Sequence, residues 1–297
     1  MPSLFSRMRH AALTLLLASF CCCGLLAGAQ AMAASSPLQA EYAQAQRAAN
    51  QAGEQRLVLV AAAMDASSQA FVGDVKLVER ELRRFAPGLV ALHLANVPGG
   101  PQRKAWPEAT PRALQLTLAR AGTLLHGGKP EESLAVVLLS SHGHVGLLSA
   151  ARNARDYSDV HVSELREWLQ PLGETPTLLI ISSCYSGSLI PLLEQDNRII
   201  ITAASDRTSS FGCEPESHNT YFIDSLFGDG LDPKESLEQW FARGAKLVAQ
   251  REAQMQLTPP SNPQLWVGKA MKRLANRPLR ELLGSFGAGS PSYNSRP

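Results

Sequence analysis

The sequence has almost no net charge, and this absence excludes one class of partner. The chain has 297 residues, with 28 lysine and arginine residues against 26 aspartate and glutamate residues. Residues 1–33 contain two arginines and no acidic residue, so 26 residues of each sign remain in the rest of the chain. A chain without net charge has no field that would attract nucleic acid or an anionic membrane surface. We therefore expect no nucleic-acid partner.

Two patterns that mark cofactor and metal proteins are also missing. The first predicted strand runs into Ala61-Ala-Ala-Met-Asp65, which contains no glycine, so it has no phosphate-binding loop. The spacing of metal ligands is absent too, because His142-x-His144 alone is too small a set. The sequence predicts no cofactor and no metal.

Cysteine is scarce outside the first 33 residues. Three of the five cysteines are Cys21–Cys23, which leaves only Cys184 and Cys213 in the remainder. Two cysteines in an oxidising compartment often form a disulfide. A disulfide is therefore one alternative for this pair, beside the free catalytic thiol considered below.

The amino terminus has the pattern of a secretory signal peptide over residues 1–33. Arg7 and Arg9 precede an apolar stretch over residues 11–26, and small residues follow up to Ala33, where we expect cleavage. Lipidation at Cys21–Cys23 is an alternative. An uncleaved membrane anchor is another, because a spanning helix needs only about 20 residues. All three predict a secreted or periplasmic protein, with a possible membrane tether in the last two cases.

The rest of the chain is predicted to contain one large domain. Residues 34–52, rich in alanine and glutamine, read as a leader helix or a linker, and residues 284–297 read as a disordered tail. The domain then spans residues 53–283. No internal repeat is present, and the sequence gives no indication of the oligomeric state.

Apolar strands alternate with amphipathic helices through this domain. The predicted strands are residues 57–63, 89–94, 134–139, 177–181, 198–203 and 264–267. The predicted helices are residues 72–85, 110–125, 163–169 and 233–255. This alternation predicts an α/β three-layer sandwich, with about six mostly parallel strands flanked by helices.

Two of these strands run directly into residues with catalytic chemistry. The strand 134–139 precedes His142, and the strand 177–181 precedes Cys184. Parallel sheets bind ligands at the carboxyl ends of their strands, so neighbouring strands would bring these side chains together. A thiol needs a base or cation to become a nucleophile, and an imidazole can supply this and protonate a leaving amine. We predict a catalytic dyad of His142 and Cys184, with His144 as the second choice of base.

Backbone N–H groups beside the dyad would complete such a site. Gly143 follows the histidine with no side chain in the way, so its N–H can stabilise an oxyanion, together with the N–H of Cys184. These two groups are the predicted oxyanion hole.

The same stretches resemble the legumain family of cysteine peptidases, which is grouped with caspases and gingipains. The resemblance rests on an apolar strand followed by Ser-His-Gly-x-x-Gly, and on a second strand followed by Ser-Cys-x-Ser-Gly-Ser. A third stretch matches after the next strand. The matching residues are 141–146, 183–188, 201–213 and 220–224.

The resemblance implies a caspase-like fold, a thioester intermediate on Cys184 and a protein or peptide substrate. It also implies substrate-binding roles for residues around the nucleophile and in the specificity pocket. These residues are Ser182, Tyr185, Ser210 and Asp224. Cys213 recurs in the matching stretch and is expected to be a thiol of the pocket wall.

The chain departs from the legumain pattern and looks like a divergent, bacterial-type member. The family's Asn-x-Arg-His sequence is replaced at Ser68-Gln-Ala-Phe71, and an acidic residue expected two positions before Cys184 is replaced by Ser182. We therefore do not expect asparaginyl specificity. Asp224 would favour a basic substrate side chain if it is buried and unpaired.

The predicted function is hydrolysis of peptide bonds by a Cys-His dyad. Two alternatives stay open. A catalytically inactive binding or scaffold protein would explain the lost asparagine, and a transamidase would use the same thioester with an amine as acceptor.

Overall fold

The computed structural model describes residues 36–99 and 106–284. The predicted signal peptide and residues 285–297 of the predicted tail lie outside these ranges. Within them, no helix combines the length and the apolar character that crossing a membrane requires.

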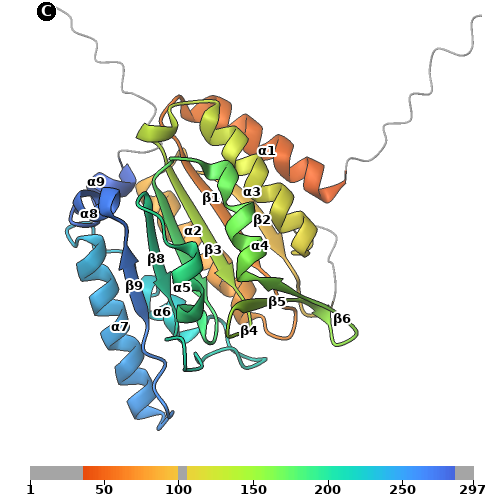
Figure 1. Cartoon of the computed structure of the whole chain (residues 1–297), viewed down its shortest axis with the longest axis vertical. Helices are drawn as coiled ribbons and strands as arrows, with labels where there is room; N and C mark the ends of the chain where they lie inside the picture. Colours follow the sequence, from red (N-terminus) through yellow and green to blue (C-terminus); the bar gives the residue numbers. More distant parts are fainter. Residues whose placement is uncertain (1–35, 100–105, 285–297) are drawn as a thin grey trace, which may run out of the picture. The chain divides into compact units, whose positions relative to one another are not determined.

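A six-stranded sheet forms the centre of the described structure (Figure 1). Five strands are parallel, and β9 joins the edge in the antiparallel sense. In sheet order the strands are β2 (Val90–Ala95), β1 (Leu57–Ala63), β3 (Leu134–Ser140), β7 (Thr177–Ser182), β8 (Arg198–Thr202) and β9 (Gln264–Val267). The predicted α/β class and the mostly parallel six-stranded sheet are confirmed.

The strands form where they do because both faces of the sheet are covered. Every residue of β1, β3 and β7 is buried. Such strands read as continuous apolar runs and not as an alternation. This pattern is why the bounds predicted for these three strands agree with the observed bounds to within one residue.

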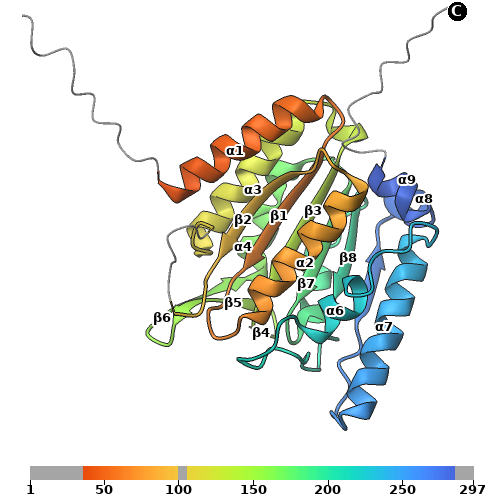
Figure 2. The ribbon, with the colours of Figure 1, turned by 180° about the vertical axis from the view of Figure 1, so that it is seen from behind.

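Helices cover the two faces of the sheet and create two separate cores. One face carries α1 (Pro37–Ala52), α3 (Pro111–His126), α4 (Val162–Trp168) and α5 (Ile190–Leu193), as Figure 1 shows. The opposite face carries α2 (Ala70–Phe85), α6 (Tyr221–Phe227) and α7 (Leu237–Gln254), as Figure 2 shows. Two short helices follow β9, namely α8 (Lys272–Ala275) and α9 (Leu279–Gly284). The result is the expected three-layer arrangement.

The first helix belongs to this packing, so residues 37–52 are not a loose linker. Ala45, Ala49 and Ala52 are at most 5% exposed and join the same core as β2 and α3. The hydroxyl groups of Tyr42 and Thr117 lie 3.1 Å apart, which ties α1 to α3. The small alanine side chains let the helix lie close to its neighbours.

A second, three-stranded sheet was not predicted. It consists of β4 (Gly143–His144), β5 (Leu147–Asn153) and β6 (Asp156–His161), all antiparallel. Strand β4 has only two residues, the residues of β5 are only partly buried at most positions, and most residues of β6 are exposed and polar. They therefore lack the apolar pattern that marks the main sheet, although they begin directly after His142.

Candidate active site

The ends of β3 and β7 bring the two predicted dyad residues to one edge of the sheet. The strands are parallel neighbours, and Ser140 is paired with Ser182. Just beyond them, the N–H of Ser141 donates to the carbonyl of Ser182 at 3.1 Å. His142 and Cys184 each follow two residues after this pair, so they leave the sheet at the same level.

Direct contact between the two loops requires the glycine after His142. A Cβ atom at Gly143 would lie 2.9 Å from both the carbonyl oxygen of Cys184 and the Oγ of Ser183. Contacts this short to backbone are not tolerated, so only glycine lets the loops approach. This explains the His-Gly pattern in physical terms.

The thiol of Cys184 faces the loop that contains Ser210. The N–H of Ser210 donates to the sulfur at 3.3 Å, and the carbonyl and hydroxyl oxygens of Ser210 lie 3.6 and 3.7 Å from it. Cys184 is half-buried. Ser210 is therefore a direct neighbour of the Cys184 thiol.

Cys184 and Cys213 are both free thiols. Burial, with further contributions from the nearby Cys184 and Glu214, raises the pKa of Cys213 to about 11. Cys213 therefore stays protonated at neutral pH and is a poor nucleophile. Among residues 36–99 and 106–284, neither thiol belongs to a group of three or more potential metal ligands.

Tyr185 follows Cys184 in a strained turn. Its φ of 55° lies in the left-handed region, which side-chain-bearing residues rarely adopt. The N–H of Tyr185 donates to Thr208 at 2.9 Å, which holds the turn in place. Its ring stacks on the exposed imidazole of His144, with 6.0 Å between centroids. His144, the alternative base, therefore lies on the rim with Tyr185.

Three residues that the motif did not include surround His142. The Oγ of Ser67 lies 3.0 Å from Nε2 of His142, and the ring of Phe71 meets the imidazole edge-on at 5.1 Å. Asp65 accepts a hydrogen bond from the N–H of Ser67 and one from the hydroxyl of Ser149, both at 2.9 Å. Ser67 and Asp65 follow β1, the other neighbour of β3. The rule that polar residues gather after parallel strands was the signal that could have found them.

Beneath the two strand ends lies a buried carboxyl group, that of Asp74 on α2. It accepts hydrogen bonds from the Ser140 hydroxyl at 2.7 Å and from the N–H and hydroxyl of Thr220, each at 2.9 Å. The hydroxyl groups of Thr220 and Ser182 lie 2.9 Å apart. Burial raises the pKa of Asp74 to about 7, although these hydrogen bonds act in the opposite direction.

This network gives Ser182 an interior position. Its side chain is 1% exposed and its hydroxyl bonds to Thr220. The side chain therefore supports the end of β7 from within, and it does not face an open surface.

Asp224 does not meet the condition set for a basic preference. Its carboxylate on α6 forms an ion pair of 2.9 Å with Arg251 on α7, and it is 44% exposed. The Arg251 guanidinium also lies 3.7 Å above the ring of Tyr221. Because Asp224 is neither buried nor unpaired, its charge is already compensated by a residue of the protein.

The two backbone groups expected to form an oxyanion hole are unengaged. The N–H of Cys184 donates to no acceptor in the described part of the chain. Gly143 pairs with Leu148, and the N–H of Ser149 donates to His142, which makes this a non-hydrogen-bonded pair. In such a pair the N–H groups point away from the partner strand. The N–H of Gly143 is thus not consumed by β5.

Comparison with known proteins identifies the family to which the chain belongs. No curated protein sequence matches the chain. A crystal structure of caspase-1 from Spodoptera frugiperda aligns with a TM-score of 0.49 and 12% sequence identity, over 72% of this chain and 86% of that one. Residues 121–273, just over half of the chain, match the sequence model of the Peptidase C13 family. The chain belongs to the Peptidase C13 family, the legumain family, and is a cysteine-type peptidase.

Proposed function

We propose that this peptidase cleaves peptide bonds with Cys184 as the nucleophile and His142 as the general acid and base. The observation that carries the proposal is the contact between the loops after β3 and β7, which meet at Gly143 and Cys184. A nucleophile and a base on adjoining loops are the arrangement that covalent catalysis needs.

The chemistry follows from the two side chains. His142 takes the proton of the Cys184 thiol, and the sulfur attacks the carbonyl carbon of the peptide bond. When the C–N bond breaks, the imidazolium gives that proton to the leaving amine and a thioester remains on Cys184. His142 then takes a proton from water, and the water oxygen attacks the thioester carbon. The C–S bond breaks, the carboxylic acid product leaves, and the imidazolium returns the proton to the sulfur of Cys184.

Negative charge develops on the carbonyl oxygen in both steps. The N–H groups of Cys184 and Gly143 are the donors we assign to it, because neither is used elsewhere in the described fold. Removing one donor of this kind typically costs about 10²–10³ in kcat.

His142 needs an orienting partner, and this chain lacks the asparagine of its relatives. Ser67 and Phe71 contact the imidazole here, one through a hydrogen bond and the other through ring contact, and we assign them the orienting role. Groups beyond the nucleophile and base reduce activity when lost but leave residual catalysis. Their replacement is therefore compatible with an active enzyme.

Substrate contacts are assigned to residues around Cys184. Ser210 touches the sulfur, and Tyr185 lies on the rim with His144. Asp224 is held in its ion pair with Arg251, and Ser182 contributes indirectly through its hydrogen bond with Thr220. With Asp224 compensated, we expect no strong preference for lysine or arginine.

The decisive experiment is labelling by a thiol-directed peptide inhibitor, followed by mass spectrometry. Cys184→Ala and His142→Ala are the test variants, and Cys213→Ala and His144→Ala are their matched controls. We expect one label per molecule, on Cys184, that is lost in Cys184→Ala and strongly slowed in His142→Ala. The two controls should label at close to the wild-type rate.

Other outcomes would favour the alternative functions. Unchanged labelling in Cys184→Ala would overturn the nucleophile assignment. Labelling of Cys184 without turnover of any peptide library would favour a binding protein. Faster product formation with added amines, with the amine recovered in the product, would favour transamidation.

A further inference from the structure

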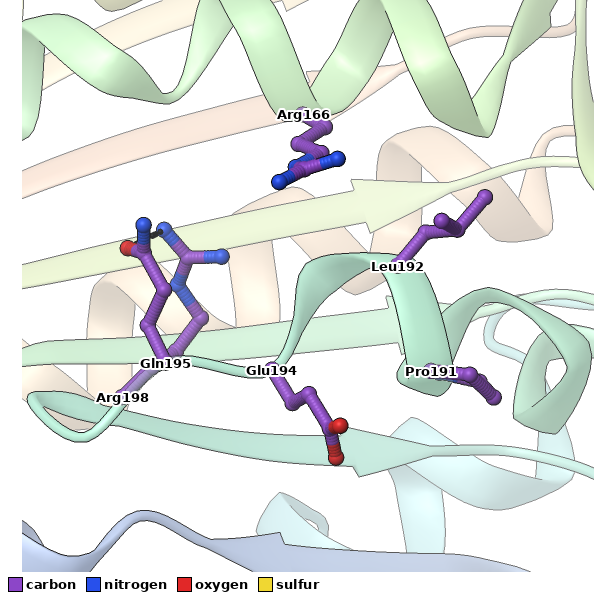
Figure 3. A pocket seen from close by; sticks show the side chains of 6 residues that line it. All are labelled: Arg166, Pro191, Leu192, Glu194, Gln195 and Arg198. Atoms are coloured by element: carbon purple, nitrogen blue, oxygen red, sulfur yellow. Dashed lines mark hydrogen bonds between the residues drawn. The ribbon is translucent and has the colours of Figure 1, made fainter.

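A pocket with two arginines is lined by residues that follow Cys184 closely in the sequence and by one residue of α4. Its volume is about 270 Å3, and it lies between α4 and the segment from α5 to β8. Figure 3 shows its lining residues, which are Arg166, Pro191, Leu192, Glu194, Gln195 and Arg198. Arg198 begins β8, whereas Cys184 follows the carboxyl end of β7. The pocket is therefore at the opposite end of the strands from the proposed active site.

Arg198 is a buried cation without a carboxylate partner. It is 3% exposed, and it forms no ion pair with any described residue. Two of its nitrogens donate to the carbonyl of Leu193 and to the side chain of Gln195, but Nε has no partner. Burial lowers the pKa of Arg198 to about 10, so it is still charged at neutral pH.

The half-buried Arg120 also has an Nε without a partner, but the other fully buried arginine, Arg56, does not. Arg56 is 8% exposed, and its Nε donates to the carbonyl of Gly53 at 2.8 Å. A buried charge is normally paired with an opposite charge or fully hydrogen-bonded. Arg198 has neither form of compensation in full.

The other lining residues add a second positive charge to the pocket, and no carboxylate among them points toward Arg198. In Figure 3 the guanidinium groups of Arg166 and Arg198 point toward one another from opposite walls. Glu194 also lines the pocket, but its carboxylate points away from both. Pro191 and Leu192 supply an apolar wall.

We infer that this pocket binds a small oxyanion group, a carboxylate or a phosphate, between Arg166 and Arg198. Guanidinium groups match the planar, paired oxygens of these anions, and charge-assisted hydrogen bonds form with them. The anion would compensate the buried charge that the protein itself leaves unpaired. This inference is independent of the catalytic assignment.

Thermal unfolding of the mature protein tests it. The melting temperature is measured against sodium phosphate and, separately, sodium acetate, with sodium chloride keeping the ionic strength constant. A ligand of the folded state raises the melting temperature in a saturable way. We expect such a rise with at least one anion, and the effective anion identifies the class.

Arg166→Gln is the test variant, because Arg166 is exposed and its loss leaves the core intact. We expect its half-saturating concentration to rise about tenfold, the effect of one charge-assisted hydrogen bond. Arg47→Gln, which removes an exposed arginine from α1, is the matched control and should behave like wild type. It also corrects for general salting-out stabilisation.

Two outcomes would overturn the inference. One is a melting temperature that neither anion raises above the chloride baseline. The other is an equal response of wild type, Arg166→Gln and Arg47→Gln.

Discussion

At the scale of single residues, the hydrogen bond between Ser67 and His142 is the contact most open to test. Ser67→Ala removes the only hydroxyl within 3.0 Å of Nε2 among the described residues. A neutral hydrogen bond is worth about 1 kcal/mol, so we expect kcat to fall about fivefold with little change in KM. Steady-state kinetics on one peptide substrate measures this.

Ser67→Thr is the matched control, because it keeps the hydroxyl. It should retain most of the activity. Equal kinetics for wild type and Ser67→Ala would show that Ser67 does not position the imidazole.

Asp74 predicts a pH dependence of stability. Its pKa is about 7 in the folded protein against 3.8 in the reference state, so the folded state holds the extra proton between these values. The contribution of protonated Asp74 to the free energy of unfolding is therefore complete below pH 4. It declines by about 4 kcal/mol as the pH rises to 7. Urea unfolding at a series of pH values should show this decline in wild type and not in Asp74→Asn.

Asp229→Asn is the control for that experiment, since Asp229 is exposed. Its pH profile should parallel that of wild type. A wild-type profile parallel to that of Asp74→Asn would refute the assignment.

At the scale of elements, His93 joins α1 and α2 to the edge strand β2. Its Nδ1 lies 2.8 Å from Glu41, its Nε2 lies 3.0 Å from Glu79, and its ring stacks on Trp106. Burial lowers the pKa of His93, but the hydrogen bonds and charges of the two glutamates outweigh this and raise it to about 9. The imidazole is therefore a buried cation that holds two helices.

The sign of the resulting pH effect is opposite to that of an ordinary acidic pair. Because the folded pKa lies above the reference value of 6.5, the stabilisation is complete below pH 6.5 and is lost as the pH rises to 9. The loss is about 3 kcal/mol for the whole window. Glu41→Gln should reduce this loss of unfolding free energy between pH 6.5 and 9. Glu54→Gln, at a 73% exposed position, is the control and should leave the loss unchanged. Urea unfolding at pH 6 and pH 9 provides the comparison, and equal losses in both variants would contradict it.

The ion pair between α6 and α7 predicts a change of specificity. Arg251→Gln leaves the Asp224 carboxylate uncompensated, so cleavage after lysine and arginine should rise relative to asparagine. Both side chains are about two-fifths exposed, which limits the effect to about two- to fivefold. A positional peptide library measures the ratio.

Arg243→Gln is the matched control, because Arg243, also on α7, pairs at 2.9 Å with Glu235, which lies just before the helix. The ratio should not change in this variant. An unchanged ratio in Arg251→Gln would place Asp224 outside the specificity pocket.

At the scale of the whole molecule, α1 determines where the folded domain begins. Its three buried alanines are part of the core shared with β2 and α3. A chain that begins at residue 53 should be less stable than one that begins at residue 36, by about 2 kcal/mol from the buried methyl groups alone. Thermal unfolding of the two chains tests this, and equal melting temperatures would show that α1 is dispensable.

The sequence alone was sufficient for the strands of the central sheet and for the positions of His142 and Cys184 just after two of them, whereas the structure supplied the adjacency of those two strands. Strands buried on both faces have to be continuously apolar, and parallel strands have to present the residues after them at one edge. Gly143 indicated a point where another part of the structure comes close to the backbone, because glycine is the residue without a side chain. These features depend on neighbours in sequence and on the general geometry of a parallel sheet.

The tertiary structure decided which distant residues meet. Asp74 and Arg251 lie far from the motifs along the chain, and no local pattern marks them. Ser67 follows a parallel strand, but its contact with His142 depends on how the loop after β1 lies beside the loop after β3. The compensation of Asp224 depends on how α7 packs on α6, and the unpaired charge of Arg198 depends on where Glu194 points. Local apolar pattern determines where strands and helices form, but pairing of charges depends on packing between elements, which no single segment of the sequence encodes.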